Sequence, residues 1–75
     1  MQTIEFDLAP GASYIEVNQL LKATGISDSG GAGKAMVADG MVRVDGVVET
    51  RKTAKIRAGQ TVTCADVRIV VRTAD

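Results

Sequence analysis

The 75-residue chain contains no histidine, no tryptophan and only one cysteine, Cys64. Without histidine it lacks the commonest metal ligand and the commonest acid–base group near neutral pH. A single cysteine can form neither an internal disulfide nor a two-cysteine metal site, and its apolar strand context favours a buried thiol over a nucleophile. We therefore expect no metal, no cofactor and no catalytic residue.

Long apolar runs are also missing. None approaches the roughly 20 residues that a membrane-spanning helix needs, and the N-terminus carries no basic and apolar signal sequence. The length suits a single domain over residues 1–75. A chain this short buries only about 60% of its unfolded surface, which leaves little room for a deep substrate pocket. These absences predict a cytoplasmic binding module with no membrane partner, rather than an enzyme.

Neither sign of charge is in excess, since nine Lys and Arg residues balance nine Asp and Glu residues. Taken alone, a neutral sum argues against a nucleic-acid partner, but the charges are unevenly distributed. Residues 1–33 have one cation and four anions, and residues 58–75 have two of each, whereas residues 34–57 have six cations and three anions. The six cations of this middle segment are Lys34, Arg43, Arg51, Lys52, Lys55 and Arg57.

A basic segment near a helix start at Ser29, with its free backbone N–H groups, is suited to binding phosphates. Runs of charge are more often simply solvated loops, so the residues alone leave both interpretations open. Aromatic residues are scarce as well, because Phe6 and Tyr14 are the only two, and we expect both to pack in the core or against a helix. Single-strand binders stack bases on exposed aromatic rings. Any RNA bound here is therefore expected to be structured and held by its backbone.

The chain contains clear local signals for an α+β domain. We expect two short adjacent helices packed on a small, mainly antiparallel sheet, with an added N-terminal strand. Alternating apolar and polar residues predict a strand over residues 2–8. Ser13 and Glu16 form a capping-box pattern, which predicts an amphipathic helix over residues 13–24 that ends at Gly25.

A second helix is predicted to begin after Ser27-Asp28-Ser29 and to end at Gly40. Its small residues suggest that it packs closely on the first helix. Asp45-Gly46 between two valine-rich stretches then predicts a β-hairpin over residues 41–49. A polar loop over residues 51–55 and two further strands, 61–65 and 67–71, complete the expected order.

The chain from Tyr14 to Val62 resembles the RNA-binding domain found in small-subunit ribosomal protein S-four, which is often called the αL motif. The resemblance is carried by a Leu-Leu-Lys helix ending at Gly25, by a serine-led second helix, and by the stretches 36–40, 42–46 and 58–62. The chain is more similar still to the short bacterial YbcJ-like proteins. The matching residues there are Ser27-Asp28-Ser29-Gly30, Lys34, residues 44–52 and Lys55-Ile56.

The resemblance implies a compact domain that presents one basic face to folded RNA, often ribosomal or transfer RNA. By position, it implies phosphate contacts from Lys34, Arg43, Arg51, Lys52 and Lys55. It implies weaker contributions from Ser29, Gly30, Arg57 and Lys22. Many members of the broad family have an arginine directly after the serine that starts the second helix, where this chain has Gly30, so we expect a modest affinity.

Two other hypotheses stay open. One is a ubiquitin-like or sulfur-carrier protein-interaction module, which would need a C-terminal Gly-Gly, whereas this chain ends Arg72-Thr73-Ala74-Asp75. The other is the RNA-docking partner of an RNA-modifying enzyme. The leading hypothesis is a non-catalytic RNA-binding module that acts in translation or in ribosome and RNA maturation, with the ribosome or such an enzyme as further partners.

Overall fold

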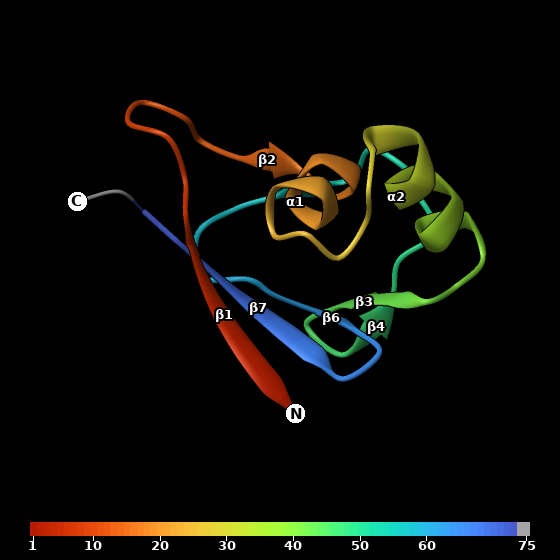
Figure 1. Ribbon diagram of the computed structural model, residues 1–75. Helices are drawn as coiled ribbons and strands as arrows, with labels where there is room; N and C mark the ends of the chain where they lie inside the picture. The colour runs from red at the N-terminus through yellow and green to blue at the C-terminus, as the bar shows by residue number, and fades with distance from the viewer. Residues whose placement is uncertain (74–75) are drawn as a thin grey trace.

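The computed structural model describes residues 1–73, and its elements within that range are shown in Figure 1. Residues 74 and 75 lie outside the described range. They include Asp75, which was counted in the charge balance, and the C-terminus on which the sulfur-carrier hypothesis depends. In chain order the elements are β1 (Gln2–Asp7), β2 (Ile15–Glu16), α1 (Val17–Ala23), α2 (Gly30–Ala38), β3 (Val42–Val44), β4 (Val47–Val48), β5 (Lys55–Ile56), β6 (Thr61–Cys64) and β7 (Val67–Arg72).

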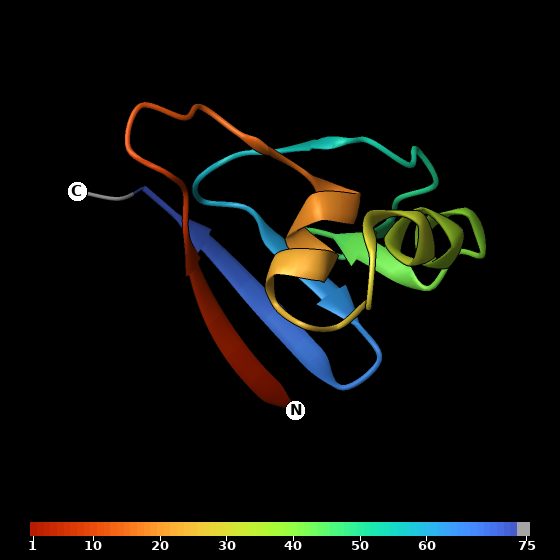
Figure 2. The same cartoon turned by 45° about the horizontal axis from the view of Figure 1, so that its top comes forward.

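Two sheets and two helices make up the described chain. The larger sheet has the strand order β1-β7-β6-β3-β4, and β2 pairs with β5 in a separate two-stranded sheet. All neighbours in the larger sheet are antiparallel except β1 and β7, which run parallel. Figures 1 and 2 show both helices on one face of the larger sheet. The predicted α+β class, with adjacent helices and an added N-terminal strand at one edge, is confirmed.

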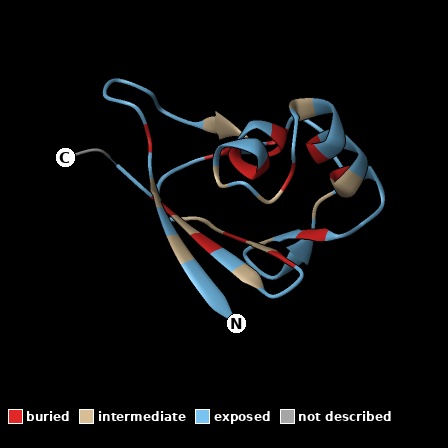
Figure 3. Ribbon diagram, viewed as in Figure 1, coloured by how far each residue is buried: buried red, intermediate tan, exposed pale blue. Residues whose placement is uncertain are grey.

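The core lies between the helices and the larger sheet, where Figure 3 shows the buried residues gathered. Strand residues alternate, so that every second side chain faces the helices. The helices and the sheet both contribute side chains with less than 2% exposure, namely Leu20, Leu21, Val37, Val42, Val62, Ile69 and Val71. Cys64 belongs to the same cluster with 2% exposure, and burial raises the pKa of its thiol. The predicted buried thiol is confirmed.

The predicted start of the first helix is wrong. Glu16 is the N-cap of α1 but makes no side-chain capping hydrogen bond, and Ile15–Glu16 is extended and pairs with Lys55–Ile56 of β5. The backbone N–H of Val17 donates to the carbonyl of Ala54 at 2.8 Å. A contact with a distant segment therefore satisfies one of the first N–H groups of α1, which have no partner within the helix. The predicted end is confirmed, because Gly25 has the left-handed φ of +79° that glycine adopts without strain.

The second helix and the hairpin form as predicted. Ser29 is the N-cap of α2, and its Oγ accepts a hydrogen bond from the backbone N–H of Ala32 at 3.0 Å. Asp45 and Gly46 have φ values of +51° and +84°, as the two central residues of a type I′ hairpin turn require. The loop predicted over residues 51–55 is correct up to its last residue, Lys55, which begins β5.

Candidate nucleic-acid interface

The segment between β4 and β6 carries four exposed cations: Arg51, Lys52, Lys55 and Arg57. We call this whole segment the basic loop. Ala54 and Ile56 are buried, with 6% and 1% exposure, and hold the segment against the core. Because side chains alternate along an extended chain, this anchoring places Lys55 and Arg57 on the outside. A shallow depression lined by Arg51, Thr53, Ala54 and Lys55 opens on the same segment.

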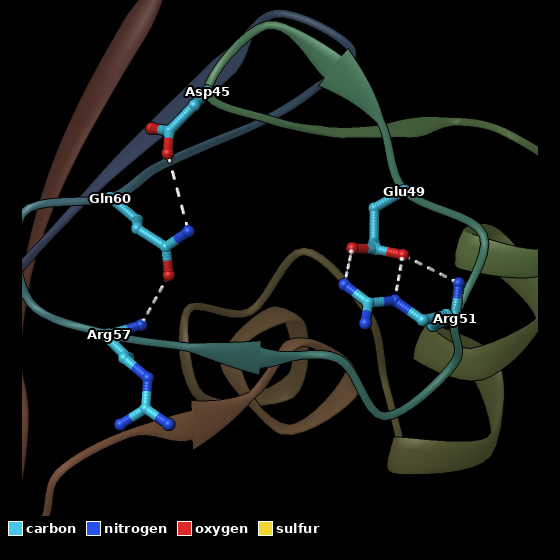
Figure 4. Close-up of polar contacts among 5 residues, drawn as sticks. All are labelled: Asp45, Glu49, Arg51, Arg57 and Gln60. Atoms are coloured by element: carbon cyan, nitrogen blue, oxygen red, sulfur yellow. Dashed lines mark hydrogen bonds and ion pairs between the residues drawn. The ribbon is translucent and has the colours of Figure 1, made fainter.

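Arg51 is held by a carboxylate. Its Nη2 lies 3.0 Å from Oε1 of Glu49 and its Nε lies 3.1 Å from Oε2, while its backbone N–H donates to Oε2 at 2.9 Å (Figure 4). Chiefly through the side-chain hydrogen bond from Arg51, this contact lowers the pKa of Glu49. Glu49 is therefore ionised at neutral pH, and its charge offsets that of Arg51.

Arg57 is placed by a short chain of polar contacts. Its backbone N–H donates to Oε1 of Gln60 at 2.7 Å, and Nε2 of Gln60 donates to Oδ2 of Asp45 at 3.4 Å. The other oxygen of Asp45 accepts from the backbone N–H of Thr61 at 2.9 Å. These contacts join the turn of the β3–β4 hairpin to the end of β5. Figure 4 shows the Arg57 guanidinium pointing away from them, and no described carboxylate lies within 4 Å of it.

Tyr14 belongs to this surface and not to the core, so the prediction that it packs inside or against a helix is wrong. It is 38% exposed, and the register of β2 with β5 (Ile15 opposite Ile56) places it beside Arg57. Lys55 Nζ lies 5.0 Å from the centroid of its ring and Arg57 Cζ lies 5.9 Å from it. Phe6, by contrast, packs against the core as predicted. Only the β2–β5 pairing reveals the position of Tyr14, and no local sequence pattern signals that pairing.

Arg43 lies on a different face. Val42 of β3 faces the helices and Val44 packs against the same core, so the alternation directs Arg43 away from them. Thr63 is its partner across β6, and Thr63 is in turn opposite Arg68 of β7. Arg43 and Arg68 therefore share the outer face of the larger sheet, which the sequence analysis did not anticipate. The described chain thus carries two cationic surfaces instead of one.

The remaining candidate residues lie on the helices. Lys22 and Lys34 are exposed on α1 and α2. The Ser29 hydroxyl is occupied as the N-cap of α2. A Cβ added at Gly30 would lie 3.2 Å from Nε2 of Gln19, so the amide of Gln19 occupies the space that an arginine stem at this position would need.

Two acidic residues near the N-terminus are paired with a cation of β7. Glu5 and Asp7 of β1 both form ion pairs with Arg72 of β7, with 3.0 Å between Asp7 Oδ1 and Arg72 Nη2. Strand β1 forms one edge of the larger sheet, and β4, from which the basic loop starts, forms the other. Glu16, by contrast, lies opposite Lys55 in the β2–β5 pairing, so the charges are only partly separated.

Residues 1–73 contain no group of three or more His, Cys, Asp or Glu side chains placed to hold a metal ion. Neither α1 nor α2, the helices found in the described part of the chain, is long and apolar enough to cross a membrane.

Comparison with known proteins assigns this fold to a family. A family model described as the S4 domain matches residues 9–72, and the chain therefore belongs to the S4 domain family. The "Putative RNA-binding protein YbcJ" of Escherichia coli (strain K12) is 54% identical over 52 residues, which cover 69% of this chain and 74% of the relative. The "Uncharacterized protein YbcJ" of Shigella flexneri matches equally well, at 54% identity over 52 residues.

A solved structure is similar over most of the chain. The solution structure of YbcJ from E. coli, described as revealing an αL motif involved in RNA binding, matches with a TM-score of 0.59 and 46% identity. The match covers 93% of this chain and 87% of YbcJ. The predicted resemblance to the S-four-type, YbcJ-like proteins is confirmed.

Proposed function

We propose that this chain is a non-catalytic RNA-binding module that holds the phosphate backbone of structured RNA with its basic loop. The observation that carries the proposal is that Lys52, Lys55 and Arg57 of the basic loop are exposed and form no ion pair within 4 Å among the described residues, although Glu16 lies opposite Lys55. Cations of this kind position a protein on a phosphate backbone without reading sequence. The similarity to YbcJ, whose name and structure are described in terms of RNA binding, supports the same function.

Ribosomal or transfer RNA is the proposed target class, and translation or RNA maturation in the cytoplasm is the proposed setting. Lys34, Lys22, Ser29 and Gly30 on the helices are proposed as secondary contacts, and Arg51 contributes less than its neighbours because Glu49 offsets its charge. An RNA-modifying enzyme or the ribosome would then be a partner recruited through the bound RNA. None of these residues is assigned a catalytic role.

The test is the salt dependence of binding. Contacts with about four phosphates predict a slope of about −3 to −4 in a plot of log affinity against log salt concentration. Between 50 and 200 mM salt, such a slope weakens binding by about 100-fold. Fluorescence anisotropy of a labelled structured RNA, such as bulk transfer RNA, measures both quantities. An affinity that did not change with salt would contradict the proposal.

Removing the charge of Glu49 is expected to strengthen binding. In Glu49→Gln the guanidinium of Arg51 loses its anionic partner, so Arg51 becomes able to contact an additional phosphate and the salt slope becomes steeper by about one. Substitution is needed because a glutamate is ionised near neutral pH, and the lowered pKa of Glu49 extends its ionised range to still lower pH. The measurement is the same anisotropy titration.

The matched control for this variant is Glu5→Gln. It changes the net charge by the same amount, but it removes a partner of Arg72 at the opposite edge of the sheet. We expect its slope to equal that of the wild type. Equal gains from the two variants would show that overall charge, and not the release of Arg51, determines the affinity.

A further inference from the structure

Tyr14 lies beside two cations of the basic loop, and the inference drawn from this position extends the proposed function, on which it rests. The ring is 38% exposed, and it has Lys55 Nζ at 5.0 Å and Arg57 Cζ at 5.9 Å from its centroid. Both cations belong to the basic loop. Figure 2 shows β2, which begins immediately after Tyr14, running alongside the segment that carries them.

The backbone next to the ring is ordered before any ligand binds. Ile15, the next residue, pairs with Ile56 and packs against the core. Val17 then starts α1 and donates its N–H to Ala54 of the basic loop. The ring and the two cations are therefore held together by the same pairing of β2 with β5, and binding a base there would require little additional ordering of the protein.

A purely structural tyrosine would be arranged differently. Buried tyrosines contribute apolar area to the core, and their hydroxyl usually finds a hydrogen-bond partner. Tyr14 is outside the core cluster, and no hydrogen bond joins its hydroxyl to a side chain or backbone group of residues 1–73. Lys55 and Arg57 lie over the ring, so a base that stacks on Tyr14 takes the place of a cation, which is then able to hold an adjoining phosphate.

We propose that Tyr14 stacks on one unpaired base of the RNA, while Lys55 and Arg57 bind the phosphates on either side of that base. Long single strands need several rings for successive bases, and Tyr14 is the only exposed aromatic residue in the described chain. The RNA class that fits one ring within a group of cations is a duplex with a single bulged or looped-out nucleotide. The proposal therefore adds base stacking to a site that otherwise binds only the backbone.

The composition of the chain provides a direct test. Tyr14 is the only tyrosine and the chain has no tryptophan, so tyrosine emission reports on this ring alone. The probes are three RNA hairpins with the same stem: one fully paired, one with a single bulged adenosine, and one with an abasic nucleotide at the bulge. Fluorescence lifetimes are measured, because absorption of light by the RNA does not alter them.

We expect the bulged adenosine to shorten the Tyr14 lifetime and the abasic bulge to leave it close to that of the paired complex. The bulged hairpin is expected to bind about tenfold more tightly than the paired one. Tyr14→Ala removes this difference, so that the variant binds the bulged and the paired hairpins equally. Tyr14→Phe keeps the difference, because stacking needs the ring and not the hydroxyl.

Tyr14→Leu separates stacking from folding. Leucine keeps an apolar side chain beside Lys55 and Arg57, so this variant should unfold at the wild-type temperature and still fail to distinguish the bulged hairpin. If Tyr14→Ala and Tyr14→Leu still prefer the bulged hairpin, the stacking inference is wrong and backbone binding stands. If the wild type binds none of the three hairpins, the proposed function fails, and the inference fails with it.

Discussion

Replacing Gly33 with alanine is expected to destabilise the fold by about 2 kcal/mol, the middle of the range for overpacking a well-packed interior. Gly33 is buried in α2, where that helix crosses α1. A Cβ there would lie 2.8 Å from the backbone oxygen of Asn18 and 3.2 Å from its Cα. Both atoms belong to the backbone of α1, so no side-chain rotation relieves the clash and the helices must move apart.

Thermal unfolding followed by circular dichroism measures this effect. For a domain of this size, about 2 kcal/mol corresponds to a midpoint lower by about 10 °C. The cost exceeds the gain of up to about 1 kcal/mol that alanine brings over glycine in a helix. A midpoint equal to or above that of the wild type would show that α1 and α2 can separate without loss.

Gly31→Ala is the control in the same helix. The only atom near a Cβ at this position is Ser29 Oγ, at 3.9 Å, which is ordinary contact. Helix propensity then dominates, and Gly31→Ala is expected to leave the midpoint unchanged or to raise it by a few degrees. Opposite effects of the same chemical change, two residues apart, would show that the close helix crossing determines the identity of residue 33.

The parts of the fold that sequence predicts correctly are those determined by short-range signals. Ser29 caps α2 and Asp45-Gly46 forms the hairpin turn, and each needs only its immediate neighbours. The start of α1 fails because its local signal competes with a distant one. The capping box at Ser13 and Glu16 loses to the pairing of Ile15 with Ile56, which lie 41 residues apart in the chain. Local patterns carry no information about such a pairing.

In the candidate site, too, the sequence predicts the features that depend on neighbouring residues and misses those that depend on tertiary contacts. A run of cations is visible in the sequence, and it does form an exposed loop. The pairing of Arg51 with Glu49 depends on side-chain geometry within a turn, and the exposure of Tyr14 depends on the β2–β5 sheet. Arg43 is different, because the alternation of Val42, Arg43 and Val44 already predicts an outward side chain. The alternation does not show which face of the sheet the helices cover, or that Arg43 shares the other face with Arg68. Both depend on the packing of the helices and on the pairing of β3, β6 and β7.

The two cationic surfaces make it possible to locate the RNA. In the double variant Lys52→Ala/Lys55→Ala the basic loop loses two phosphate contacts, so the salt slope is expected to fall by about two units. Near 0.1 M salt the affinity should fall by about tenfold or more, since each lost contact removes its counterion release. Anisotropy titrations with a fully paired hairpin provide both numbers, and they avoid any contribution from stacking on Tyr14.

The variant Arg43→Ala/Arg68→Ala shows which of the two cationic surfaces binds RNA. It removes the same net charge, but from the outer face of the larger sheet. These arginines lie on either side of Thr63 and point away from the helices. If RNA lies on the basic loop, this variant loses less affinity than Lys52→Ala/Lys55→Ala, because its arginines point away from the helices and attract that RNA only through longer-range, screened interactions. If instead it reduces the slope by about two units and Lys52→Ala/Lys55→Ala does not, the RNA crosses the outer face of the sheet. That result would replace the basic loop with Arg43 and Arg68 as the binding surface.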